Sequence, residues 1–114
     1  MFPEWFDQSV FAGRTLEMIC FNANQVYFHF DNHIFICAEA PFSFQSTMGA
    51  VEFGVPPTQS DQLLLLIERQ ISAASIAEQK ILTIKFENGA ELRFAPTHGY
   101  EAYRVTIGDK TAII

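Results

Sequence analysis

Hydrophobic and polar residues alternate most clearly in the second half of the chain. Every second residue from Leu82 to Phe86 is hydrophobic, the residues between them are polar, and a second alternating run extends from Leu92 to Phe94. A period of two is typical of strands with one buried face. A three-residue loop at 87–89 keeps the two hydrophobic faces together, whereas a two-residue loop would mix them. The pattern predicts a hairpin that pairs Phe86 with Ala90, Lys85 with Glu91 and Ile84 with Leu92.

The same pattern occurs in the first half, which indicates an internal duplication. Residues 13–38 can be laid over residues 68–94 with one insertion, so that Arg14 matches Arg69 and Leu16 matches Ile71. Each copy predicts a three-stranded antiparallel meander. The expected strands are 14–21, 25–30 and 34–38 in the first unit, and 70–77, 81–86 and 90–95 in the second. In the first copy the loop is Asp31-Asn32-His33, which places His33 where the second copy has Gly89, a conformation that His tolerates better than most residues.

The remaining segments complete a mainly β (α+β) fold. Residues 41–57 lack a clear period and end at Pro56-Pro57, and the apolar spacing of 59–69 predicts one helix. Tyr103–Ile107 and Thr111–Ile114 predict a closing hairpin across 108–110. We expect a sandwich or partly open barrel packed by the helix.

The chain length of 114 residues suits one domain, because two separate cores would each be too small. The expected parts of this domain are a first meander unit at 13–40, a linker and helix at 41–69, a second meander unit at 70–96 and a closing hairpin at 102–114.

The charge is uneven. The formal net charge is −6, and residues 1–67 hold seven acidic side chains against Arg14 alone, whereas residues 68–114 carry six of each sign. Binding of nucleic acid or an anionic membrane relies on clustered Lys and Arg, so we expect neither as a partner. A basic protein partner is compatible with this charge.

The start of the chain lacks the basic residues of a secretory signal, and the aliphatic run Leu63–Ile67 is too short to span a membrane. We therefore expect a cytoplasmic protein. Cys20 and Cys37 are then expected to be buried thiols rather than a disulfide.

Aromatic residues gather in the first half. Ten of the twelve Phe and the only Trp precede residue 54. The outward face of the first meander unit is predicted to carry Tyr27, His29, Phe35 and Cys37, where the second unit has Thr83, Lys85, Glu91 and Arg93. Two interpretations stay open. Either the N-terminal segment or the helix covers this face, or it is a surface for a partner or a second copy.

Two groups of residues are candidates for a metal-binding or a catalytic site. His29, Asp31 and His33 have the residue types of a metal site, but the predicted turn at 31–33 breaks the alternation that would place them on one face. We expect no metal or other cofactor.

The loop at 97–101 gathers His98, Tyr100 and Glu101, a potential base, phenol and acid. No nucleophile is paired with them, and Pro96 with Gly99 also explains the segment as an ordinary turn. No glycine-rich phosphate loop, nucleophile elbow or paired-cysteine motif occurs.

The C-terminal part contains the pattern F-x-(D/N)-G-x-x-L, a Pro, and then Tyr-Glu-(Ala/Ser)-aromatic. The residues of this pattern are Phe86, Asn88, Gly89, Leu92, Pro96, Tyr100, Glu101, Ala102 and Tyr103. In this pattern the chain resembles a family of small bacterial proteins of unknown function. The resemblance implies an immunity-like or other small interaction protein.

Our leading hypothesis is a non-enzymatic protein-binding domain, immunity-like, that inhibits a basic partner. Acidic groups would steer the encounter and aromatic side chains would anchor the complex. The candidate contact residues are Tyr27, His29, Asp31, Phe35 and Glu39. One alternative is a small-molecule-binding protein or minor hydrolase that uses His98, Tyr100 and Glu101. The other is a self-associating structural domain, such as a homodimer.

Overall fold

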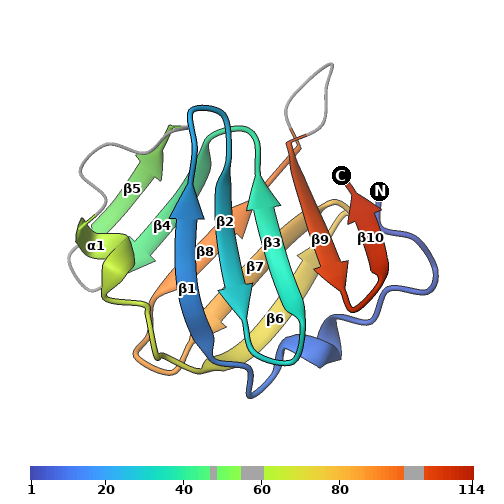
Figure 1. Cartoon of the computed structure of the whole chain (residues 1–114), viewed down its shortest axis with the longest axis horizontal. Helices are drawn as coiled ribbons and strands as arrows, with labels where there is room; N and C mark the ends of the chain where they lie inside the picture. The colour runs from blue at the N-terminus through green and yellow to red at the C-terminus, as the bar shows by residue number, and fades with distance from the viewer. Residues whose placement is uncertain (47–48, 55–60, 97–101) are drawn as a thin grey trace.

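The computed structural model describes residues 1–46, 49–54, 61–96 and 102–114. In this part of the chain, two five-stranded antiparallel sheets pack face to face as a sandwich and do not close into a barrel (Figure 1). The first sheet has the order β1-β2-β3-β9-β10, and the second has the order β5-β4-β8-β7-β6. The strands of the first sheet are β1 Leu16–Phe21, β2 Val26–Phe30, β3 Ile34–Ala38, β9 Tyr103–Ile107 and β10 Lys110–Ile113. Those of the second are β4 Phe42–Ser46, β5 Gly49–Phe53, β6 Ile71–Ala77, β7 Ile81–Phe86 and β8 Glu91–Phe94. Two short helical turns precede the meanders, η1 Gln8–Phe11 and α1 Asp61–Leu64.

The duplication extends to five strands in each copy. Each meander, β1-β2-β3 or β6-β7-β8, is followed in the chain by a hairpin, β4-β5 or β9-β10. Each hairpin crosses to the opposite sheet, so that β4 pairs with β8 and β9 pairs with β3. The two copies therefore complete each other's sheets.

Backbone hydrogen bonds link the copies symmetrically where each meander begins. Thr15 and Gln70 form an antiparallel bridge. The amide of Leu16 donates to the carbonyl of Arg69 at 3.0 Å, and the matching amide of Ile71 donates to Arg14 at 2.7 Å. A β-bulge follows at the same place in each copy, between residues 16 and 18 and between residues 71 and 73. The duplication predicted from the sequence is thus present in the backbone.

The predicted meanders and their register are confirmed. Ile84 pairs with Leu92, and Lys85 pairs with Glu91. In the first copy, Phe30 pairs with Ile34 across the loop at 31–33. Gly89 has a φ of 87° and His33 a φ of 59°, as their shared loop position requires. Asn32 also has a positive φ, 63°, so two residues of the first loop adopt the left-handed region, against Gly89 alone in the second.

The expected irregular segment at 41–57 is wrong, because it contains the hairpin β4-β5. Phe42 and Phe44 alternate with polar residues and are both buried, so a period of two was present but short. Val51 in β5 is exposed, which breaks the alternation that marks a half-buried strand. Pairing of β4 with β8 therefore stabilises the β4-β5 hairpin more than the hairpin's own hydrophobic pattern does.

The helix predicted at 59–69 is a single turn, Asp61–Leu64. After it, the amides of Leu66, Ile67 and Arg69 donate to carbonyls three residues back, which is a tighter winding. Leu64 and Leu65 are 51% and 66% exposed. The aliphatic run therefore does not form one wide buried face. The chain must instead straighten by Gln70 to bridge Thr15.

The closing hairpin has a two-residue loop rather than the predicted loop at 108–110. Ile107 pairs with Lys110, which leaves Gly108 and Asp109 between the strands. Gly108 has a φ of 63°, the positive value that a glycine at the first position of a type II′ turn adopts.

The two segments before the meanders fill opposite open sides of the sandwich (Figure 1). Phe11 and Leu66 are completely buried, and each carbonyl accepts from the arginine three residues later at 3.0 Å. The N-terminal segment also bonds to the second copy through the amide of Phe2 and the carbonyl of Gln79, 2.8 Å apart. Phe2 lies beside the buried Tyr103 ring. These segments thus belong to the core.

Candidate functional site

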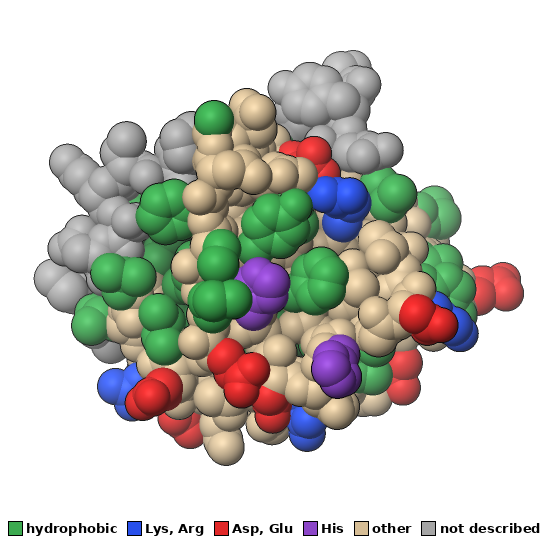
Figure 2. Space-filling model, in the orientation of Figure 1, with side chains coloured by type: hydrophobic (Ala, Val, Ile, Leu, Met, Phe, Trp, Pro, Cys, Tyr) green, Lys and Arg blue, Asp and Glu red, His purple; other side chains and the backbone are tan. Residues whose placement is uncertain are grey.

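The outer face of the first sheet carries two rows of side chains that cross all five strands. Their members follow from the strand register. The upper row is Cys20, Tyr27, Cys37, Arg104 and Ile113, and the lower row is Met18, His29, Phe35, Thr106 and Thr111. Figure 2 looks onto this face and shows hydrophobic side chains gathered over its middle, around a histidine. We call these ten residues the outer rows.

Neither the N-terminal segment nor the segment after α1 covers the outer rows, because both lie along the open sides of the sandwich. Met18 is 48% exposed and Ile113 is 50% exposed. Tyr27, His29 and Phe35 are half-buried by their neighbours in the sheet. The sequence left open whether the N-terminal segment or the helix covers this face. For the described residues, the interpretation that they cover it is wrong.

The equivalent face of the second sheet is polar. Its strands have the same pairing, and its two rows are read from the register in the same way. They contain Ser75, Thr83, Arg93, Ser43 and Glu52, and Ala73, Lys85, Glu91, Gln45 and Ala50. Where the first sheet has the rings of His29 and Phe35, the second has an ion pair between Lys85 and Glu91, with the atoms 3.5 Å apart. The fold therefore does not require the outer rows to be apolar.

Three aromatic rings form the centre of the outer rows. The ring centroids of Tyr27 and His29 are 6.0 Å apart, and those of His29 and Phe35 are 5.6 Å apart. The Tyr27 hydroxyl donates to Oε1 of Gln25 at 3.1 Å. Contacts between rings on neighbouring strands stabilise the pairing and hold the rings in place. The centre is thus a preorganised aromatic surface.

Arg104 forms a polar edge beside these rings. Its Nε lies 3.0 Å from Oε1 of Glu39 in an ion pair, and its Nη2 donates to Sγ of Cys37 at 3.7 Å. The hydrogen bond with Cys37 raises the pKa of Arg104. Hydrogen bonding with Cys37 also raises the pKa of Tyr27. Arg104 therefore stays charged and the Tyr27 phenol stays protonated at neutral pH.

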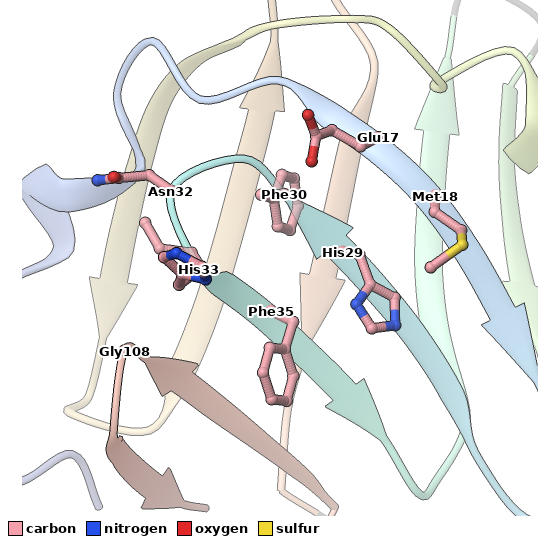
Figure 3. Close-up of a pocket in the computed structure, with 9 residues that line it drawn as sticks. Glu17, Met18, His29, Phe30, Asn32, His33, Phe35 and Gly108 are labelled. Carbon is pink, nitrogen blue, oxygen red and sulfur yellow. The ribbon is translucent and has the colours of Figure 1, made fainter.

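A depression of about 630 Å³ lies at the end of the face where β2 turns into β3. Figure 3 shows Glu17 from β1, His29 from β2, Phe35 from β3 and Gly108 from the last hairpin around it. His33 also lines it, on the left in this view. Two copies of the repeat thus contribute to one hollow that also borders the aromatic centre.

The residues with metal-ligand chemistry separate in the structure. His29 belongs to the outer rows, whereas Asp31 bonds elsewhere. Its Oδ1 accepts from the Thr15 amide at 2.8 Å and its Oδ2 lies 3.8 Å from Nη1 of Arg14. Over residues 1–46, 49–54, 61–96 and 102–114, no group of three His, Cys, Asp or Glu side chains could hold a metal ion. Asp31 therefore acts as a turn anchor rather than as a partner of His29 and His33.

The two cysteines are free thiols, Cys37 buried and Cys20 half-buried. Tyr27 separates them in the upper row, because Cys20 and Cys37 pair with it from opposite sides. The strand between them keeps their α-carbons too far apart for a disulfide.

The chain matches the model of a family of unknown function (DUF6188) over residues 8–114. The chain belongs to this family. Comparison with curated proteins finds no match, and neither does comparison with solved structures. The resemblance expected from the sequence, a family of unknown function, is thus confirmed at that level.

Membership of DUF6188 identifies no activity. The predicted loop residues His98, Tyr100 and Glu101 lie outside the described residues. No helix in the described part of the chain is long and apolar enough to cross a membrane.

Sequence reasoning missed several residues of the face. It overlooked Met18 and Glu17 because the bulge in β1 shifts the alternation by one residue, and no local pattern marks a bulge. It overlooked Ile113 and Arg104 because only the long-range pairing of β3 with β9 brings them beside β2 and β3. The outward positions Tyr27, His29 and Phe35 were found correctly from the period of two.

Proposed function

We propose that this protein is a non-enzymatic binding domain whose outer rows dock a basic protein partner. The observation that carries the proposal is the contrast between the two sheets of one molecule. Equivalent positions have the same pairing, yet one outer face is polar and the other is rich in aromatic and aliphatic groups.

Exposure of an apolar face to water is unfavourable in free energy, and the polar second sheet shows that the fold does not require it. Burying apolar surface contributes roughly 25 cal/mol per Å². Docking of a partner on the outer rows would recover this free energy, with Tyr27 and Phe35 as anchors. The half-buried rings are already ordered by their contacts with His29, so little conformational entropy is lost on binding.

The charge favours a basic partner over a second copy. The chain has a net charge of −6, so two copies repel each other. Arg14, before β1, and Arg104, in the outer rows, are already paired with Asp31 and Glu39. A basic surface would be attracted to the acidic first copy, mainly through a faster association rate.

Two finer features follow from the same proposal. If the partner is a toxin, its capture would be the immunity-like role that the C-terminal pattern implies. The cytoplasm is the compartment we propose, because the half-buried thiol of Cys20 would stay reduced there.

The test replaces two aromatic side chains of the outer rows by their polar counterparts from the second sheet. Tyr27→Thr with Phe35→Glu gives the first sheet the residues that the second sheet carries at these positions. The matched control, Thr83→Ala with Glu91→Gln, changes the equivalent positions of the second sheet. Immobilised wild type and both variants are incubated with lysate of the source cells, and captured proteins are quantified by mass spectrometry. We expect basic proteins that bind wild type and the control but are depleted at least tenfold by the first-sheet variant.

Two results would contradict the proposal. One is a captured set that does not change between wild type and the first-sheet variant, although circular dichroism shows that both are folded. The other is a homodimer in light scattering that the first-sheet variant converts to a monomer, since the face would then bind a second copy.

A further inference from the structure

We infer that the depression lined by Glu17, His29, Phe35 and Gly108 receives a lysine or arginine side chain of the partner. This inference rests on the proposed function and specifies the chemistry of the contact. The depression is on the same outer face as the aromatic centre, so an inserted side chain would extend from a partner docked on the outer rows.

The bulge in β1 places Glu17 at this hollow. Leu16 pairs with Phe30 and Met18 pairs with His29, so Glu17 has no partner residue in β2. Leu16 is buried, whereas Glu17 and Met18 are both exposed. An uninterrupted strand would turn these two side chains to opposite faces. The extra residue thus brings a carboxylate and a thioether to the same side.

Among the residues that the structure describes, no cationic side chain forms an ion pair with the Glu17 carboxylate. The ion pairs among the described residues are Arg14 with Asp31, Lys85 with Glu91, and Arg104 with Glu39. At the equivalent place on the second sheet, Lys85 occupies the position of His29 and pairs with Glu91. Lys85 thus pairs with a carboxylate on the next strand of the second sheet, whereas His29, in the same position of the first sheet, forms no such ion pair among the described residues.

The walls of the hollow suit the rest of a long cationic side chain. The charged end would lie beside the Glu17 carboxylate and methylene groups would pack on Met18, while the Phe35 ring lines the opposite side of the hollow (Figure 3). The space beside Gly108 is open, because a β-carbon there would meet no atom within 4 Å. Carboxylate, ring and open space together select a cation rather than an anion or an apolar group.

The test is a titration of the ¹⁵N-labelled full chain, followed by NMR. The probes are N-acetyl-lysine methylamide and N-acetyl-arginine methylamide, with N-acetyl-norleucine methylamide as the neutral probe of similar length. We expect saturable shifts of the Glu17, His29, Phe35 and Gly108 amides with at least one cationic probe and about fivefold weaker binding of the neutral one. Glu17→Gln should weaken cation binding by about the same factor.

Glu52→Gln is the matched control, because it removes one exposed carboxylate from the second sheet. It should leave the titration unchanged. Equal binding of the neutral and cationic probes, or no effect of Glu17→Gln in a folded protein, would overturn the inference. The two proposals can fail separately. If Tyr27→Thr with Phe35→Glu abolishes partner capture while Glu17→Gln does not, the face binds but the cation site is wrong.

Discussion

Tyr103 shows how one residue joins the two copies. Its ring is almost completely buried between the sheets and lies 5.6 Å from the Phe94 ring, centroid to centroid. Its hydroxyl donates to the carbonyl of Lys80 at 2.6 Å, so a strand of the first sheet is bonded to the turn before β7. Burial raises the pKa of the Tyr103 phenol well above its ordinary value. This residue therefore couples packing, hydrogen bonding and ionisation.

Tyr103→Phe should lower the free energy of unfolding by about 1 kcal/mol at neutral pH, because the hydrogen bond is lost and the ring stays. The phenol of the unfolded chain ionises above about pH 10, whereas the folded one stays protonated. The folded state then binds more protons, so stability falls as the pH rises above 10. Urea unfolding at pH 8 and pH 11 should show the advantage of wild type over Tyr103→Phe shrinking. An advantage that grows with pH would contradict the assigned burial.

At the scale of elements, the loops of the two meanders make a matched pair. Both have three residues, and the last residue of each has a positive φ. The position is occupied by His33 in one and by Gly89 in the other, and a β-carbon at Gly89 would meet no atom within 4 Å. At this last loop position, the difference between His33 and Gly89 is therefore one of backbone strain and not of space.

His33→Gly should stabilise the protein by about 0.5–1 kcal/mol, because a non-glycine residue in this region costs about 1–2 kcal/mol and the added chain entropy offsets part of that. The reciprocal change, Gly89→His, should destabilise it by about 1 kcal/mol. Thermal unfolding followed by circular dichroism measures both. The prediction is contradicted if the two substitutions shift the midpoint in the same direction.

The local hydrophobic pattern predicts some elements of this fold correctly and fails for others. The strands at 81–86 and 91–94 alternate regularly and were predicted with their register. The aliphatic run 63–67 has the composition of a buried helix but forms one turn, because only Leu63 and Leu66 have room in the sandwich. A run that is apolar on every side does not specify which side is buried.

At the scale of the whole molecule, the exchange of hairpins makes the two copies interdependent. The first sheet needs β9 and β10 from the second copy, and the second sheet needs β4 and β5 from the first. Phe11 and Leu66 fill the two open sides of the same core. Neither copy can therefore form its complete sheet alone.

Phe11→Ala and Leu66→Ala should each lower the free energy of unfolding by about 3 kcal/mol, since both remove a fully buried side chain. Leu65→Ala, at the exposed neighbour, should change it by less than about 0.5 kcal/mol. Urea unfolding followed by Trp5 fluorescence and by circular dichroism should give one coincident transition in every variant. Separate transitions in Leu66→Ala would mean that the copies fold independently.

The meander strands, their loops, the register across those loops and the duplication could be predicted from the sequence, because they depend on a period of two and on turn chemistry between near neighbours. The sequence also placed Tyr27, His29 and Phe35 on an outward face. Three features could not be predicted in this way: this face is uncovered, the hairpins change sheets, and Glu17 reaches the depression. These features depend on the bridge between Thr15 and Gln70, on the pairing of distant strands and on a bulge, none of which leaves a periodic trace in the chain.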